Sequence, residues 1–113
     1  FGHAIEAATG YVDWLHGEAV GVGLLIAARM SQRLGELSAD DVARVEALLK
    51  LAGLRTDAPK IGAARAAGFM SIDKKVKSGR VRLVLLKGLG QAYISGDYPD
   101  SALEETLRES FGA

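Results

Sequence analysis

The stretch Ala19-Val-Gly-Val-Gly-Leu-Leu-Ile-Ala-Ala28 decides the fold of this chain. None of its side chains is charged or strongly polar, and it lies within a helical pattern that runs from about Leu15 to Leu34. A helix that is apolar on all sides must be buried, so the stretch predicts a central helix enclosed by other elements. It is also shorter than the ~20 apolar residues that a membrane-spanning helix needs.

Gly21 and Gly23 stand inside this predicted helix, where each glycine costs about 1 kcal/mol of helix propensity relative to alanine. Because glycine has no Cβ, it allows another backbone to approach closely. We therefore expect a second backbone segment to pack against this face of the central helix. Arg29 and Arg33 mark the end where the helix emerges into water.

The rest of the sequence predicts a mostly α, multihelical domain with one small β hairpin. Ser38 and Asp41 form a capping-box pattern, and Gly53 follows the last apolar residue of the helix that they begin. The aliphatic and β-branched run 80–86 predicts a strand, and a glycine turn at 88–90 leads into a second strand. The expected helices are at 1–8, 15–34, 38–53, 61–69 and 99–111, and the expected strands are at 80–86 and 91–94.

Composition indicates one soluble globular domain and excludes several kinds of function. The 113 residues are 49% hydrophobic and 25% charged, and 14 basic residues balance 14 acidic ones. A nucleic-acid-binding domain would normally carry a basic surplus, so we expect no nucleic-acid partner. The absence of cysteine excludes disulfides and thiolate metal sites and is consistent with a reducing compartment. With no recognisable signal peptide or membrane span, we expect a cytoplasmic protein and no membrane partner.

Both histidines lie in the first eighteen residues. His16 stands at the beginning of the central helix, and neutral imidazole is the commonest metal ligand among side chains. His3 and Glu6 are three residues apart on one predicted helix, so the carboxylate can set the tautomer of the imidazole for proton transfer. Because this spacing matches no self-contained metal motif, a structural histidine and a surface His–Glu pair remain open explanations.

The segment Asp73-Lys-Lys-Val-Lys-Ser-Gly-Arg80 is the cationic cluster of the chain. Such a run is typical of a solvated loop, although its cations could also bind a phosphate or carboxylate. We expect an anionic substrate to meet the chain here. The turn Gly88-Leu-Gly90 differs from a dinucleotide-binding turn because it has no third glycine and no helix after it. We therefore expect no nucleotide site in these residues.

Three motifs together resemble the 3-dehydroquinate synthase family of the sugar phosphate cyclases. They are FGHAIE at 1–6, WLHGEAV at 14–20, and DKKVKSGRVRLVLL at 73–86 with the glycine turn after it. The resemblance covers essentially the whole chain and implies the helical C-terminal domain of that family. It implies a shikimate-pathway lyase that converts 3-deoxy-D-arabino-heptulosonate 7-phosphate into 3-dehydroquinate and phosphate. Such enzymes use tightly bound NAD and a divalent metal, zinc or cobalt.

The resemblance also implies roles for particular residues. His16 matches a metal-binding histidine, and His3 matches a histidine that contacts the substrate and takes part in proton transfer. One of Lys74 and Lys75 matches a substrate-contacting lysine, and the resemblance does not distinguish between them. The two glutamates of the motifs, at 6 and 18, are expected to support the site without contacting the metal.

Several parts of the family's site have no counterpart in this chain. Two further metal ligands and the NAD-binding α/β domain precede the position that matches Phe1, so 1–113 corresponds to an N-terminally truncated C-terminal domain. We expect such a domain alone to be inactive and to bind zinc poorly. The implied partners are the phosphorylated keto-sugar acid, the missing N-terminal domain and, at full length, a second copy in a homodimer.

Two other functions remain open. One is a related sugar phosphate cyclase of the inosose or valiolone type, and the other is a non-catalytic helical scaffold. The DKK segment at 73–75 favours the synthase, because the family with that segment acts on a carboxylated substrate.

Overall fold

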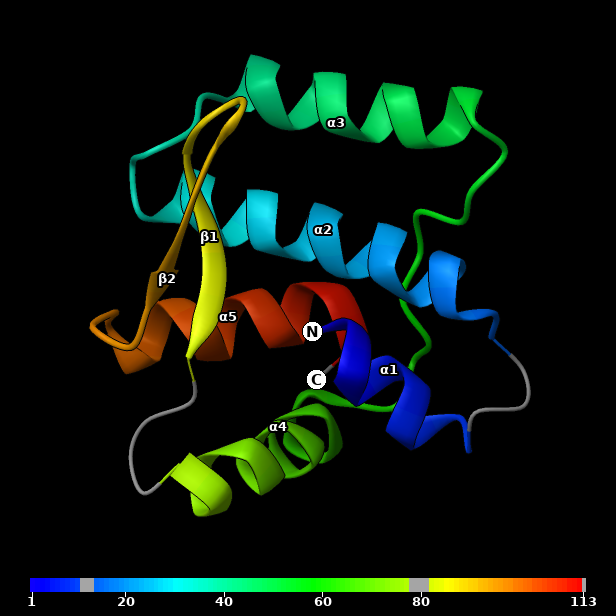
Figure 1. Cartoon of the computed structure of the whole chain (residues 1–113), viewed down its shortest axis with the longest axis vertical. Coiled ribbons are helices and arrows are strands. Elements are labelled where there is room, and N and C mark those ends of the chain that lie inside the picture. Colours follow the sequence, from blue (N-terminus) through cyan, green and yellow to red (C-terminus); the bar gives the residue numbers. More distant parts are fainter. Residues whose placement is uncertain (11–13, 78–81, 113) are drawn as a thin grey trace.

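The computed structural model describes residues 1–10, 14–77 and 82–112, and for 71–77 it describes the helical backbone without the side chains. The described part is mostly α with one antiparallel hairpin, as predicted (Figure 1). Its elements in chain order are α1 (Gly2–Ala8), α2 (His16–Arg33), α3 (Ala39–Leu51), α4 (Ala63–Lys77), β1 (Leu83–Gly88), β2 (Gln91–Ser95) and α5 (Asp100–Phe111).

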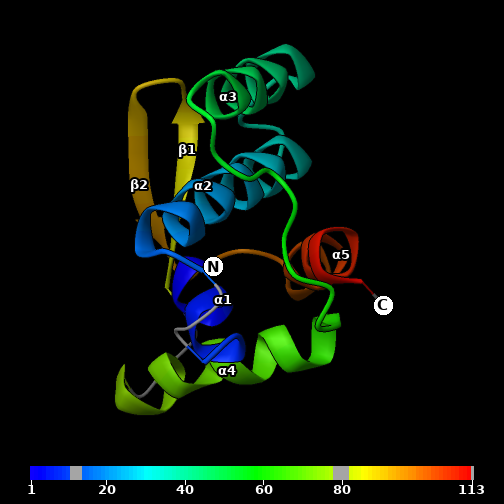
Figure 2. The same ribbon diagram turned by 90° about the vertical axis from the view of Figure 1, so that its right-hand side faces the viewer.

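Helix α2 occupies the centre of the fold and contacts α1, α3, α5 and β1. Figure 1 shows α3 on one side of α2 and α5 on the other, with α4 beyond α5. Figure 2 shows the hairpin standing along the edges of α2 and α3, as a separate layer on one face of the helices. No helix in the described ranges is long and apolar enough to cross a membrane.

The central helix is largely buried, as its apolar sequence predicts. Val22, Leu25 and Met30 are at most 1% exposed and lie in two hydrophobic clusters that meet at α2. One cluster joins α2 to α1, α4, α5 and the hairpin, and the other joins it to α3. The prediction of burial on every side is wrong at two positions, because Val20 and Leu24 are 50% and 46% exposed. Both side chains line a pocket that also contains His3 and His16.

Gly21 and Gly23 of α2 face different neighbours. A Cβ added at Gly23 would lie 2.8 Å from the backbone nitrogen of Gly2, closer than real Cβ contacts allow. The expected close backbone approach is therefore confirmed at Gly23, and the second backbone belongs to the first turn of α1. At Gly21 the nearest atoms belong to the side chains of Leu54 and Leu49, at 3.4 and 3.5 Å, so the expectation of a backbone neighbour there is wrong.

Helix α4 is longer than the sequence analysis predicts. It continues beyond Phe69 to Lys77, so 73–77 of the charged run belong to a helix rather than to a loop. The physical reason is that 70–77 contain neither glycine nor proline, and their methionine and lysines are good helix formers. Residues 78–80 of the run, and 80–81 of the predicted strand, lie outside the described residues.

The predicted hairpin is confirmed, with β1 and β2 antiparallel and a register irregularity between Leu86 and Gly88. A buried serine on α2 fastens it to the helices. The Ser31 hydroxyl donates to the carbonyl of Ala27 at 2.8 Å and accepts from the backbone N–H of Leu86 at 2.9 Å. A second attachment is the hydroxyl of Tyr93, which donates to the carboxylate of Glu36. Burial, together with the Glu36 carboxylate, raises the pKa of Tyr93 to about 12.

The two arginines near the end of α2 connect three helices. Arg29 pairs with Glu46 of α3 at 3.5 Å and with Glu109 of α5 at 4.0 Å. Arg33 pairs with the same Glu109 at 2.7 Å and with Glu105 at 3.0 Å. Both arginine side chains are less than one-third exposed. The sequence suggested that these arginines emerge into water. They lie instead in a network of carboxylates at the surface.

We expect Gly23→Ala to lower the free energy of unfolding by about 1–3 kcal/mol, because the added methyl group must push α1 away from α2. Gly17→Ala on the same helix is the matched control, since nothing lies within 4 Å of its added Cβ. That change should be neutral or stabilising by up to about 1 kcal/mol. Urea denaturation measures both. Equal stability of the two variants would show that the α1–α2 contact is looser than described.

We expect Ser31→Ala to cost about 1–3 kcal/mol, because it leaves the inward-facing N–H of Leu86 without its acceptor. Amide hydrogen exchange at Leu86 should accelerate in this variant. Ser110→Ala is the control: that serine is also buried, but its hydroxyl has no hydrogen-bond partner within the described ranges. Its replacement should be nearly neutral. If Ser110→Ala lost as much stability as Ser31→Ala, the role of the Ser31 hydrogen bonds would be contradicted.

Candidate functional site

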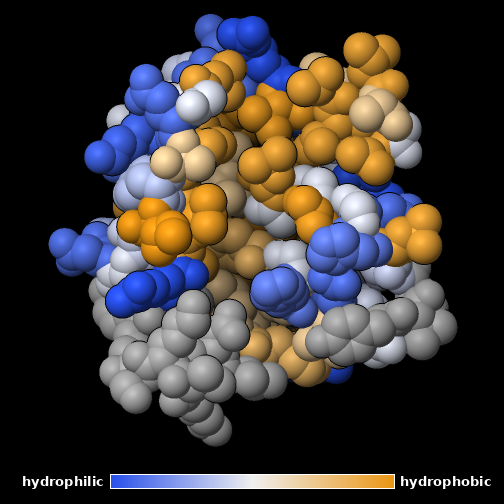
Figure 3. All heavy atoms as spheres, in the orientation of Figure 1, coloured by the Kyte–Doolittle hydropathy of each residue, from blue (hydrophilic) through white to orange (hydrophobic). Residues whose placement is uncertain are grey.

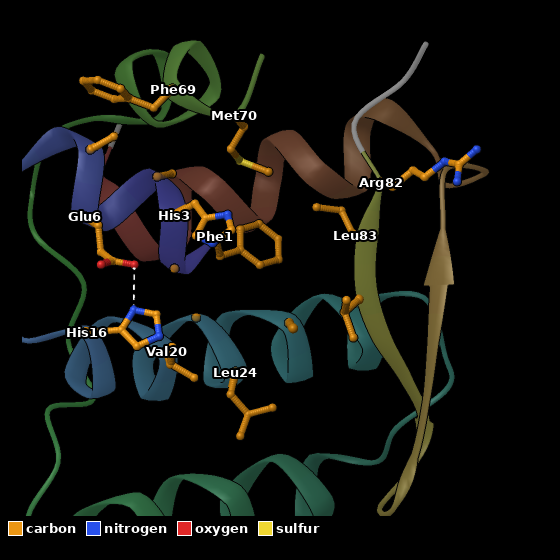
Figure 4. A pocket seen from close by; sticks show the side chains of 16 residues that line it. Phe1, His3, Glu6, His16, Val20, Leu24, Phe69, Met70, Arg82 and Leu83 are labelled. Carbon is orange, nitrogen blue, oxygen red and sulfur yellow. Dashed lines mark hydrogen bonds and ion pairs between the residues drawn. The ribbon is translucent and has the colours of Figure 1, made fainter. Parts of the chain in front are cut away.

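A pocket of about 880 Å³ opens between α1, α2, α4 and the beginning of β1. Figure 3 shows it as a hollow between the hairpin and α1, on a face where apolar side chains are gathered. Figure 4 shows that the two histidines lie on its walls, His3 from α1 and His16 from α2. The other labelled lining residues are Phe1, Glu6, Val20, Leu24, Phe69, Met70, Arg82 and Leu83.

His16 is the first residue of α2, and its imidazole is hydrogen-bonded to a carboxylate of another helix. Its Nδ1 lies 3.1 Å from Oε1 of Glu6 (Figure 4). The imidazole side chain is 73% exposed, whereas the Glu6 side chain is 14% exposed. Helical spacing predicts a pair between Glu6 and His3 on the same helix. That expectation is wrong, because Glu6 reaches across to α2, a contact that helical spacing within α1 does not reveal.

His3 lies near this pair without joining it. Its side chain is exposed on the pocket wall and forms no hydrogen bond within the part of the chain that the structure describes. An exposed imidazole in a pocket is free to exchange a proton with a bound molecule. The structure thus brings His3, Glu6 and His16 into one pocket, with Glu6 committed to His16.

Glu18 supports the beginning of α2 and does not face the pocket. Its carboxylate accepts a hydrogen bond from the backbone N–H of Leu15 at 3.0 Å and pairs with Arg55 at 3.3 Å. The Arg55 guanidinium in turn lies over the ring of Trp14, 4.3 Å from its centroid. These contacts satisfy the helix N-terminus and hold the backbone on which His16 is mounted. Arg55 is distant in sequence from WLHGEAV, and no local signal predicted its place here.

The cationic side of the pocket is described in part. Arg82 lines the pocket from the residue before β1, although the sequence analysis assigned it no role. Lys74 and Lys75 lie in the last turns of α4, which reaches the pocket through Phe69 and Met70. The side chains of both lysines lie outside the described residues, so their predicted contact with substrate stays a prediction.

Within the described ranges, no three His, Asp or Glu side chains come together as a metal site. The donor chemistry of His16 nevertheless fits one ligand of a shared site. Its ring is exposed on the pocket wall, and Nε2 has no hydrogen-bond partner among the residues that are described. Neutral imidazole binds zinc and similar divalent metals through one such nitrogen.

Sequence comparisons identify the relatives of the chain. The family model for the 3-dehydroquinate synthase C-terminal domain matches residues 1–76. The chain is 49% identical to the 3-dehydroquinate synthase of Acidithiobacillus ferrooxidans over 96% of its length. It is 51% identical to the synthase of Pseudomonas aeruginosa over 100% of its length. The chain spans 30% and 31% of these two relatives.

Two solved structures share the fold. A 2-epi-5-epi-valiolone synthase from Streptomyces hygroscopicus subsp. jinggangensis, with NAD+ and Zn2+ bound, matches 96% of the chain with a TM-score of 0.80 and 22% identity. A 2-deoxy-scyllo-inosose synthase, in complex with carbaglucose-6-phosphate, NAD+ and Co2+, matches 97% with a TM-score of 0.73 and 24% identity. The chain covers 31% and 34% of these two proteins. At 22% and 24% identity, the similarity to these two structures shows a shared fold and nothing further.

Proposed function

The chain belongs to the family of 3-dehydroquinate synthase C-terminal domains, and we propose that it serves as that domain in a complete 3-dehydroquinate synthase. The proposed enzyme is a lyase of the shikimate pathway. It converts 3-deoxy-D-arabino-heptulosonate 7-phosphate into 3-dehydroquinate and phosphate. Because the chain spans about 30% of its curated relatives, the activity belongs to a longer protein in this proposal.

One observation supports the proposal above the others. The motifs FGHAIE and WLHGEAV lie on different helices, yet their histidines and Glu6 line one pocket. Helix α1 contributes His3 and Glu6, and α2 contributes His16 at its first residue. A plain structural role for either histidine would not require this convergence.

Each residue has a proposed task in the reaction. His16 holds the divalent metal, zinc or cobalt, through a ring nitrogen, jointly with ligands from outside this chain. A metal bound there would supply the positive charge that stabilises oxygen anions of the substrate. His3 contacts the substrate and moves a proton, a role that its exposed position on the pocket wall allows. Lys74 or Lys75 contacts an anionic group of the substrate.

The remaining partners are proposed from the same family membership. We place an NAD-binding α/β domain before this chain, so that the pocket becomes one wall of a cleft between two domains. The NAD+ and metal ions in the two solved structures are consistent with such an arrangement for proteins of this fold. We further propose a homodimer at full length and a cytoplasmic location.

A valiolone or inosose cyclase is the second candidate, because solved enzymes of both types share the fold. The sequence relatives favour the synthase: they are about twice as similar in identity, at 49% and 51% against 22% and 24%. A scaffold without catalysis is the third candidate. The next experiment separates the synthase from a valiolone cyclase and from a scaffold.

The full-length protein should turn over the heptulosonate phosphate and not sedoheptulose 7-phosphate, as measured by phosphate release. His16→Ala should lower metal-dependent turnover by more than about 100-fold, because losing a ligand costs at least as much as losing a residue that supports one. Glu104→Gln, on α5 and outside the pocket, is the control and should leave turnover unchanged. Preference for sedoheptulose 7-phosphate would favour a valiolone cyclase. Turnover in His16→Ala at the wild-type rate would favour a scaffold role for this domain.

The 113-residue chain alone should show no turnover and bind zinc weakly, since its described part brings no three metal-binding side chains together. Isothermal titration with zinc measures this directly. Sub-micromolar affinity that disappears in His16→Ala would mean that the chain contains a complete metal site, against the proposal.

A further inference from the structure

The His16–Glu6 contact constrains which ring nitrogen carries a proton. Nδ1 faces Oε1 of Glu6 at 3.1 Å, a hydrogen-bond distance. An ionised carboxylate has no proton to donate, so the hydrogen in this contact must be on Nδ1. When the ring is neutral, the second nitrogen, Nε2, is then left with its lone pair.

The burial of the two groups shows which one holds the other in place. Glu6 is 14% exposed, and His16 is 73% exposed. Glu6 is mounted on α1, whose first turn is pressed against α2 at Gly23. The carboxylate is therefore the fixed partner, and without it an exposed imidazole at a helix end would turn freely about its side-chain bonds.

We propose that Glu6 is a positioning residue, which holds the ring of His16 in the Nδ1–H tautomer and leaves Nε2 as the nitrogen that binds metal. Metal-binding histidines commonly donate their other N–H to a carboxylate in this way, which fixes the ring and raises its basicity. The tautomer follows from the contact between Nδ1 and an ionised carboxylate. The consequence for metal binding rests on the function proposed above.

The competing explanation is a surface ion pair between a protonated His16 and Glu6, with no role toward a metal. Ion pairs at exposed positions contribute little to the stability of the fold. The two explanations differ in the tautomer of the neutral ring. The positioning role requires the proton on Nδ1, facing Oε1 of Glu6, whereas a surface ion pair leaves the tautomer of the neutral ring unconstrained.

The first measurement is the ¹⁵N spectrum of the histidine rings in the metal-free, full-length protein at a pH of about 8. The His16 signals are assigned by their loss in His16→Ala. We expect a protonated Nδ1 and an unprotonated Nε2 in the wild type. Glu6→Ala should shift His16 toward the other tautomer, whereas Glu104→Gln, which alters a carboxylate on α5 outside the pocket, should not. A wild-type ring protonated on Nε2 would overturn the proposal, whatever the variants do.

The second measurement is the affinity of the same proteins for Co²⁺, by titration of its absorption spectrum. Glu6→Ala should bind Co²⁺ about 10–100-fold more weakly, and Glu104→Gln should bind it as the wild type does. Wild-type affinity in Glu6→Ala would overturn the positioning role. Neither measurement depends on turnover. If the protein fails to act on the heptulosonate phosphate while both results hold, the proposed function falls and the role of Glu6 stands.

Discussion

The close approach of α1 to α2 is the constraint on which the rest of the structure depends. Gly2 and Gly23 bring the two backbones so near that an added Cβ at position 23 would lie 2.8 Å from a backbone nitrogen. The same contact places Glu6 within 3.1 Å of His16 and puts His3 on the opposite wall of the pocket. The approach of α1 to α2 therefore sets both the packing of the two helices and the positions of Glu6 and His16. A change that separates the helices also changes the site.

The fold could be predicted from sequence wherever the signal was local. The charge-free run 19–28 predicted the buried α2, and Ser38 predicted the beginning of α3. The run 80–86 and the glycine turn at 88–90 predicted the hairpin. Local signals failed where polarity was mistaken for a break, as in α4, whose backbone continues through the charged residues to Lys77. Helix propensity outweighed solvation there, because no glycine or proline interrupts 70–77.

Part of the candidate site was predictable as residues, but its contacts were not. His3, Glu6 and His16 were all identified, and all line one pocket. The partner of Glu6 was mistaken, since spacing along one helix says nothing of the helix beside it. Arg55 stabilises the start of α2 from far along the chain and carried no signal at all. Contacts between elements are a property of packing, which the pattern within one element does not contain.

Val20 and Leu24 give the pocket a second property. They stand one and two turns beyond His16 on α2, about half exposed, on the wall that also carries the imidazole. A molecule or a neighbouring domain that covers them displaces water from hydrocarbon, which favours closure. The same step lowers the local dielectric, so charges near the rings interact more strongly than they do in the open pocket. The strength of charge interactions near the imidazoles therefore depends on how completely water is excluded from Val20 and Leu24.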